Sequence, residues 1–162
     1  MAKKIIMLVA ITIMAITLVA CKKEIPYNAM IYDDAGEWMH EEFLLDNLTQ
    51  GVLHGDVYLD DDSYPKNINH LLRSEEEFNA VFSQFSSEID FDDSMVCIFI
   101  FTCNYTRPYE ISKISMNNQV LKIEVKSIKP KGVVGDAVPS WQRCLVVVMD
   151  KLEITSLEFV EK

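Results

Sequence analysis

The stretch MVCIFIFTC at residues 95–103 decides the fold of this chain. It is apolar on both strand parities, which is typical of a central β-strand covered on both faces rather than exposed on one. A second continuous apolar run at residues 144–149 is interpreted in the same way. These two strands must therefore be covered by other elements of the chain.

A helix over about residues 74–85 is predicted to cover one face. Ser74 is a strong N-cap, and Glu77 three residues later completes a capping box. The apolar side chains that follow recur at helical spacing: Phe78, Val81, Phe82 and Phe85. A second helix is predicted over about residues 37–49, where apolar side chains form i, i+4 pairs.

The remaining elements are predicted to be short strands. They are expected at residues 52–59, 68–72 and 155–160, with a hairpin of 109–116 and 120–128 that turns at Asn117-Asn118. In the second arm of this hairpin, Leu121, Ile123 and Val125 are expected to face inward. The fold class is therefore α+β, with about six short, mostly antiparallel strands, one strong helix and a second helix. Without βαβ alternation, a doubly wound parallel sheet is not expected.

The N-terminus has the pattern of an export signal. Lys3 and Lys4 precede an uncharged apolar run at residues 5–20, which is shorter than the ~20 residues that a transmembrane helix needs. The run ends in Leu18-Val19-Ala20-Cys21, which resembles the lipobox of bacterial lipoproteins. In that motif the cysteine thiol receives a diacylglycerol group. The alternative is an uncleaved signal anchor with a chance cysteine.

This signal predicts how the chain is organised. Residues 1–20 are expected to be a signal peptide, residues 21–32 the lipidated Cys21 and a tether, and residues 33–162 a single globular domain. One acyl chain binds a membrane only marginally, whereas two chains on one glycerol hold a protein at its surface. The predicted location is therefore the extracytoplasmic face of a membrane, in the cell envelope.

The chain is acidic, with 25 acids against 15 bases among its 162 residues and a net charge of −10. Removal of the leader takes Lys3 and Lys4 with it and lowers the net charge to −12. Nucleic-acid binding needs clustered Lys and Arg, so a nucleic-acid partner is not expected. The acids are concentrated in residues 24–65 and the bases in residues 107–131. Either these are two solvated regions, or they complement each other or steer a partner.

No motif for catalysis or for a metal site occurs in the sequence. There is no HExxH, CxxC, P-loop or GxSxG pattern, and the acids at Asp56 and Asp60–Asp62 lack the spacing of a calcium loop. The prediction is therefore a protein that is not an enzyme, with no metal and no cofactor. Besides Cys21, the cysteines are interpreted as buried thiols, with a Cys103–Cys144 disulfide as the alternative if their strands are neighbours.

Two loops carry residues that often dominate binding interfaces. Tyr105, Arg107 and Tyr109 lie between the apolar strand and the hairpin, and Trp141 ends a long loop that begins at Lys129. Tyr, Trp and Arg are enriched in interface hot spots. We predict these four residues as a partner-binding site, or as stacking faces for a glycan or small solute. The alternative is that Tyr109 and Trp141 close the edge of the core.

Residues 68–160 resemble the C-terminal domain of the PrcB family, small bacterial lipoproteins known from a spirochaetal protease complex. The resemblance rests on LRSEEEF at 72–78, IDFD at 89–92, YEI at 109–111 and Pro139 before the second apolar strand. It implies a non-catalytic accessory role. The predicted function is thus a lipid-anchored extracytoplasmic interaction module, with a surface protease as the implied partner. A binding module for an envelope glycan or a small solute is the alternative.

Overall fold

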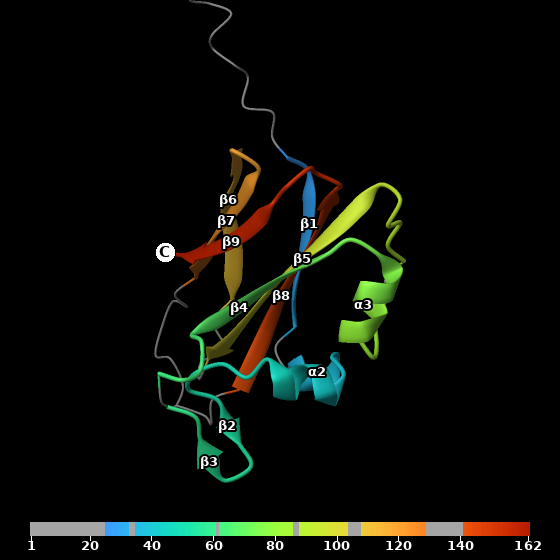
Figure 1. The fold of residues 1–162 in the computed structure, drawn as a ribbon. Helices are drawn as coiled ribbons and strands as arrows, with labels where there is room; N and C mark the ends of the chain where they lie inside the picture. Colours follow the sequence, from blue (N-terminus) through green and yellow to red (C-terminus); the bar gives the residue numbers. More distant parts are fainter. Residues whose placement is uncertain (1–24, 33–34, 61, 86–87, 104–107, 129–140) are drawn as a thin grey trace, which may run out of the picture.

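The computed structural model describes residues 25–32, 35–60, 62–85, 88–103, 108–128 and 141–162. Four antiparallel strands form the larger sheet, in the order β1 (Tyr27–Tyr32), β8 (Trp141–Asp150), β5 (Ser94–Cys103) and β4 (Asn67–Leu72). The two apolar runs thus lie side by side as β5 and β8 in the middle of this sheet (Figure 1). The prediction of a central strand at 95–103 is confirmed.

A second sheet of three strands packs against the first. Its order is β6 (Tyr109–Asn117), β7 (Val120–Ser127) and β9 (Ser156–Glu161), with β6 and β7 antiparallel and β7 and β9 parallel. The predicted hairpin is confirmed, but its turn lies one residue later than expected. Asn117 pairs with Val120, and the two turn residues, Asn118 and Gln119, have φ of 48° and 61°. Such positive φ values are typical of tight hairpins.

The two faces of β5 belong to two separate cores. Side chains of even number, such as Val96, Ile98 and Ile100, pack with the helical elements. Side chains of odd number, such as Phe99, pack against the three-stranded sheet, including the inward-facing Leu121, Ile123 and Val125, none of which is exposed. The molecule is therefore a three-layer structure of helices, larger sheet and smaller sheet, which explains why residues 95–103 are apolar on both parities.

The helix after β4 is shorter than its sequence predicts. α3 spans Glu75–Val81, and the Ser74 side chain accepts a hydrogen bond from Glu77 N at 3.2 Å, which confirms the N-cap. The helix ends because Phe82 is extended and forms a bridge with Met39, while Ser83 N donates to Trp38 O at 3.0 Å. The predicted end at residue 85 is therefore wrong, and Phe85 lies beyond the helix.

The predicted helix at 37–49 is also broken into shorter pieces. A 3-10 helix, η1 (Ala35–Glu37), is followed by α2 (Glu41–Asp46). His40 N donates to Val81 O at 2.9 Å, so the backbone between the two pieces bonds to the end of α3 instead of continuing a helix. The longest of these helices has seven residues, and no helix in the described part of the chain is long and apolar enough to span a membrane.

Two further predictions need correction, one for residues 52–59 and one for the end of the tether. Residues 52–59 form not one strand but a small hairpin, β2 (Leu53–His54) and β3 (Val57–Tyr58), because Gly55 adopts a φ of 59° and reverses the chain. Tyr27–Tyr32, the end of the predicted tether, instead forms β1 and pairs with β8 along its whole length. The folded part therefore begins before residue 33. The observed fold is mostly antiparallel strands with two short α-helices, and it is richer in strand than expected.

Figure 1 shows how these elements are placed relative to β1. β1 enters the sheet at one end of the molecule, and the β2–β3 hairpin projects from the opposite end. α3 lies on the side of the larger sheet that faces away from β6, β7 and β9.

Candidate functional site

The residues that the sequence analysis selected are described only in part. Cys21, Tyr105 and Arg107 lie outside the described residues, whereas Tyr109 and Trp141 lie within them. Trp141 is half-buried at the start of β8 and pairs in register with Cys103. Tyr109 is half-buried at the start of β6 and packs against the core between the two sheets.

Tyr109 is held by contacts on several sides. Its ring centroid lies 4.8 Å from that of Phe101, and the guanidinium carbon of Arg143 lies 5.2 Å from its ring centroid. Its hydroxyl donates to Glu161 Oε1 at 3.4 Å. Burial raises the pKa of Tyr109 well above its usual value, and the nearby Glu161 carboxylate raises it further. These contacts are those of a residue that closes one end of the core.

Arg143 is a buried cation that the sequence analysis did not select. It is only 2% exposed, and its guanidinium lies over the rings of Phe101 and Tyr109. Stacking over aromatic faces is a favourable setting for a guanidinium. A single arginine directly before the apolar run at 144–149 was the available signal.

The three described cysteines, Cys97, Cys103 and Cys144, form no disulfide with one another. Cys103 and Cys144 lie on neighbouring strands but on opposite faces of the sheet, because Cys144 pairs with Ile100 and packs with the helical side. Burial raises the pKa of Cys97 to about 12 and raises that of Cys144 as well. Reactive cysteines need a lowered pKa, so these two thiols have the setting of structural residues.

A network of polar side chains ties the segment after α2 to one end of the larger sheet. His70 Nε2 and Asn47 Oδ1 are 2.8 Å apart, and Gln142 Nε2 donates to Asn47 O at 2.9 Å. The hydroxyls of Thr49 and Thr102 are 2.5 Å apart. Burial lowers the pKa of His70. Since each of these polar groups has a partner within the protein, the network has a structural role.

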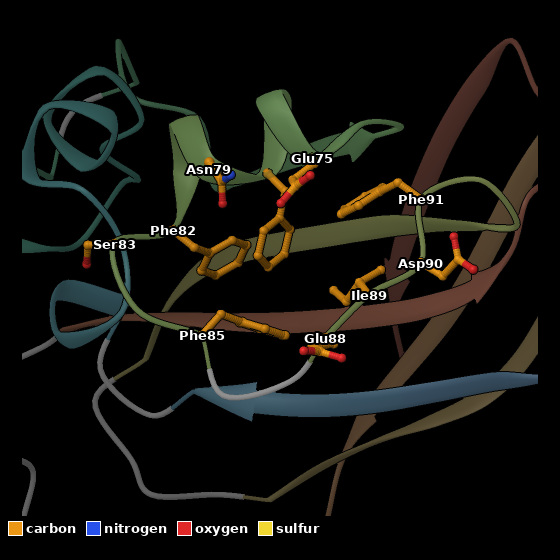
Figure 2. Close-up of a pocket in the computed structure, with 10 residues that line it drawn as sticks. Glu75, Asn79, Phe82, Ser83, Phe85, Glu88, Ile89, Asp90 and Phe91 are labelled. Carbon is orange, nitrogen blue, oxygen red and sulfur yellow. The ribbon is translucent and has the colours of Figure 1, made fainter.

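A hollow lies beside α3, and the sequence analysis did not identify it. It has a volume of about 510 Å³, within the ~300–1,000 Å³ range of ligand clefts. We call it the α3 groove. Its lining residues come from α3 and the segment that follows: Glu75, Phe78, Asn79, Phe82, Ser83, Phe85, Glu88, Ile89, Asp90 and Phe91. Figure 2 shows Phe82, Phe85, Ile89 and Phe91 pointing toward a common space from the two sides.

The floor and walls of the α3 groove are aromatic. Phe78 is its central member, with ring centroids 4.7 Å from Phe82, 4.8 Å from Phe85 and 5.6 Å from Phe91. Phe78 and Phe82 are buried, whereas Phe85 and Phe91 are half-buried. The accessible parts of these outer rings therefore form an apolar surface that the described residues do not cover.

The rim of the α3 groove is acidic. Glu75, Glu88 and Asp90 are exposed, and the ten lining residues include no lysine, arginine or histidine. Asp90 also shapes the rim, because its Oδ1 accepts a hydrogen bond from Asp92 N at 3.0 Å. The combination is an apolar floor with acidic side chains around it.

A second hollow of about 480 Å³ adjoins the first and shares four of its residues: Glu75, Ile89, Asp90 and Phe91. It also contains two cations, Arg73 and Lys151. Both donate to backbone carbonyls, Arg73 Nη2 to Ile154 O at 2.6 Å and Lys151 Nζ to Phe91 O at 2.7 Å. We call the two adjoining hollows together the trough, which therefore contains two cations as well as the acids.

One sequence signal could have located this groove. In residues 88–92 acids alternate with apolar residues, as Glu88-Ile89-Asp90-Phe91-Asp92. Part of this stretch carries the family resemblance. Its alternation also indicates a wall with both acidic and apolar side chains. The helical spacing of Phe78, Phe82 and Phe85 was read only as core packing.

Comparison of the chain with family models, with curated proteins and with solved structures gave no match. The described residues hold no group of three or more His, Cys, Asp or Glu side chains placed to bind a metal ion. The proposals below therefore rest on the sequence pattern and on the geometry of the α3 groove.

Proposed function

We propose that this chain is a lipid-anchored, extracytoplasmic interaction module that binds a partner protein through the α3 groove. The observation that carries the proposal is the half-buried cluster of Phe85, Ile89 and Phe91, which lines the groove on the folded domain. Apolar clefts with a polar rim are typical of binding sites. The anchor part of the proposal rests on the lipobox-like sequence that ends at Cys21.

The groove lies beside α3, which is on the side of the larger sheet away from β6, β7 and β9 (Figure 1). Its wall at Ile89 and Phe91 directly precedes β5, which starts at the same end of the sheet as β1. The resemblance of residues 68–160 to the PrcB family makes a surface protease the first partner to test.

The glycan or small-solute alternative has less support in the described residues. It needs free aromatic faces at Tyr109 and Trp141, but the ring of Tyr109 packs against Phe101 and lies under Arg143. The rings of the α3 groove are phenylalanines, which carry no hydrogen-bonding group, so sugar hydroxyls could bind there only to the polar rim.

The anchor is tested by mass spectrometry of the purified, membrane-extracted chain. We expect a mature N-terminus at Cys21 that carries a diacylglycerol group, and release from membranes or blocked cleavage in Cys21→Ala. A wild-type chain that retains residues 1–20 and carries no lipid would contradict this part of the proposal.

The groove is tested by two matched substitutions on α3, Asn79→Trp and Ala80→Trp. Both side chains are exposed, but only Asn79 lines the groove. We expect Asn79→Trp to fill the space and abolish co-isolation of the partner from detergent-solubilised membranes, and Ala80→Trp to leave it unchanged. Identical sets of co-isolated proteins from the two variants would contradict docking in the groove.

A further inference from the structure

The charge and shape of the α3 groove point to one class of occupant. We propose that it binds an extended segment of the partner protein in which lysine or arginine alternates with aromatic or aliphatic residues. This inference rests on the proposed function, since it names the partner chemistry for the same site.

Charge complementarity is the first argument. Three carboxylates surround the groove, and none of its ten lining residues is basic. The mature chain as a whole has a net charge of −12, which attracts a basic partner and repels an acidic one. Arg73 and Lys151 line only the adjoining hollow, and an acidic or purely apolar segment would bring no further positive charge to Glu75, Glu88 and Asp90.

The aromatic walls favour the same partner. The faces of phenylalanine rings attract ammonium and guanidinium groups, and their edges pack with apolar side chains. The outer rings, Phe85 and Phe91, are both half-buried and pack on the buried Phe78. A segment that carries both cationic and apolar side chains satisfies the floor and the rim together.

The spacing of the wall favours an extended chain. Acidic and apolar residues alternate from Glu88 to Asp92, and Glu88, Ile89, Asp90 and Phe91 all line the groove. Side chains of an extended segment also alternate with a period of two residues. The adjoining hollow continues the same wall, so the trough fits a stretch of polypeptide rather than a single small cation.

Two fluorescent synthetic peptides test this inference against the full-length chain in detergent. In one, lysine alternates with phenylalanine and leucine, and in the other, glutamate replaces every lysine. We expect the lysine peptide to bind, with an affinity that falls as the salt concentration rises. We expect the glutamate peptide not to bind.

A matched pair of variants separates the groove from the general acidity of the protein. Glu75 and Glu76 are both exposed in the first turn of α3, but only Glu75 lines the groove. Lysine at either position loses the same interaction with the helix dipole. We expect Glu75→Lys to weaken binding of the lysine peptide about fivefold, and Glu76→Lys to change it less than about twofold.

Glu88→Lys gives a second test outside the helix, so the result does not depend on the folding of α3. We expect it to weaken binding as Glu75→Lys does. The inference is overturned if the lysine peptide does not bind, if the glutamate peptide binds equally well, or if Glu75→Lys and Glu76→Lys have the same effect. If Asn79→Trp still abolishes partner binding in any of these cases, the proposed function stands and only the partner chemistry is wrong.

Discussion

Phenylalanines cluster on both faces of β5, but the two clusters differ in how far other elements cover them. On the face toward the smaller sheet, Phe99 stacks with Phe101 and with Phe159 of β9, each at 4.9 Å, and is 1% exposed. On the helical side of the larger sheet, Phe85 and Phe91 pack on Phe78 and remain half-buried. A three-stranded sheet covers the first cluster, whereas a helix of seven residues leaves part of the second uncovered.

We propose that the two clusters have different roles, stability on one side of the larger sheet and binding on the other. The sealed cluster provides the buried area that holds the two sheets together. The open cluster retains apolar area that a partner can still bury, and acids surround it. The following predictions test whether the two clusters have these separate roles.

The largest effect is expected in the sealed cluster. Phe99→Ala should destabilise the domain by about 3–5 kcal/mol, because it leaves a cavity between Phe101 and Phe159. Urea unfolding followed by circular dichroism measures this loss. A loss of less than about 1 kcal/mol would mean that the sheets are not packed as described.

The open cluster should respond more weakly in stability and more strongly in binding. Phe85→Ala should cost about 1–2 kcal/mol of unfolding free energy, because its ring is only half-buried. Partner or peptide binding should be lost in the same variant at a temperature where it is folded. Retained binding in a folded Phe85→Ala variant would remove this ring from the site.

The helix that bounds the groove depends on its N-cap. Ser74→Ala removes the acceptor for Glu77 N and should cost about 1 kcal/mol. Ser156→Ala, at the exposed start of β9, is the control and should stay within about 0.5 kcal/mol of wild type. Equal unfolding midpoints for the two variants would show that this cap does not support α3.

The smallest effect is expected at His70, away from both clusters. Burial lowers its pKa in the folded state. At pH values between the lowered and the ordinary pKa, the unfolded chain therefore binds more protons than the folded chain. Stability should therefore fall as the pH falls from about 7.5 to about 5.5. His70→Gln, which keeps a donor for Asn47, should weaken this pH dependence, and His54→Gln should not. The same pH dependence in wild type and His70→Gln would contradict the assignment.

The sealed side could be predicted from sequence because its signals are continuous or periodic. The apolar run at 95–103 indicated a strand covered on both faces, and the alternation of Leu121, Ile123 and Val125 gave the inward face of β7. The parallel pairing of β7 with β9 was not predicted. That pairing depends on where the chain goes after β8, and no local pattern reports it.

The open side could not be predicted because tertiary contacts set its shape. The spacing of phenylalanines continues to Phe85, but the bridge between Met39 and Phe82 ends α3 at Val81. Met39 lies more than forty residues earlier in the chain, so helical periodicity contains no information about it. Two of the four residues that the sequence analysis selected for binding, Tyr109 and Trp141, are described. Tyr109 packs at the end of the core.

Photo-crosslinking in cells tests the central claim of an anchored domain with an open, partner-binding groove. A photo-reactive phenylalanine analogue is placed at Asn79 in one strain and at Ala80 in another, each in the chain with its native Cys21. The account predicts a specific protein adduct from position 79, little or none from position 80, and loss of the position-79 adduct in a Cys21→Ala background. Equal adducts from both positions, or no adduct from position 79, would contradict it.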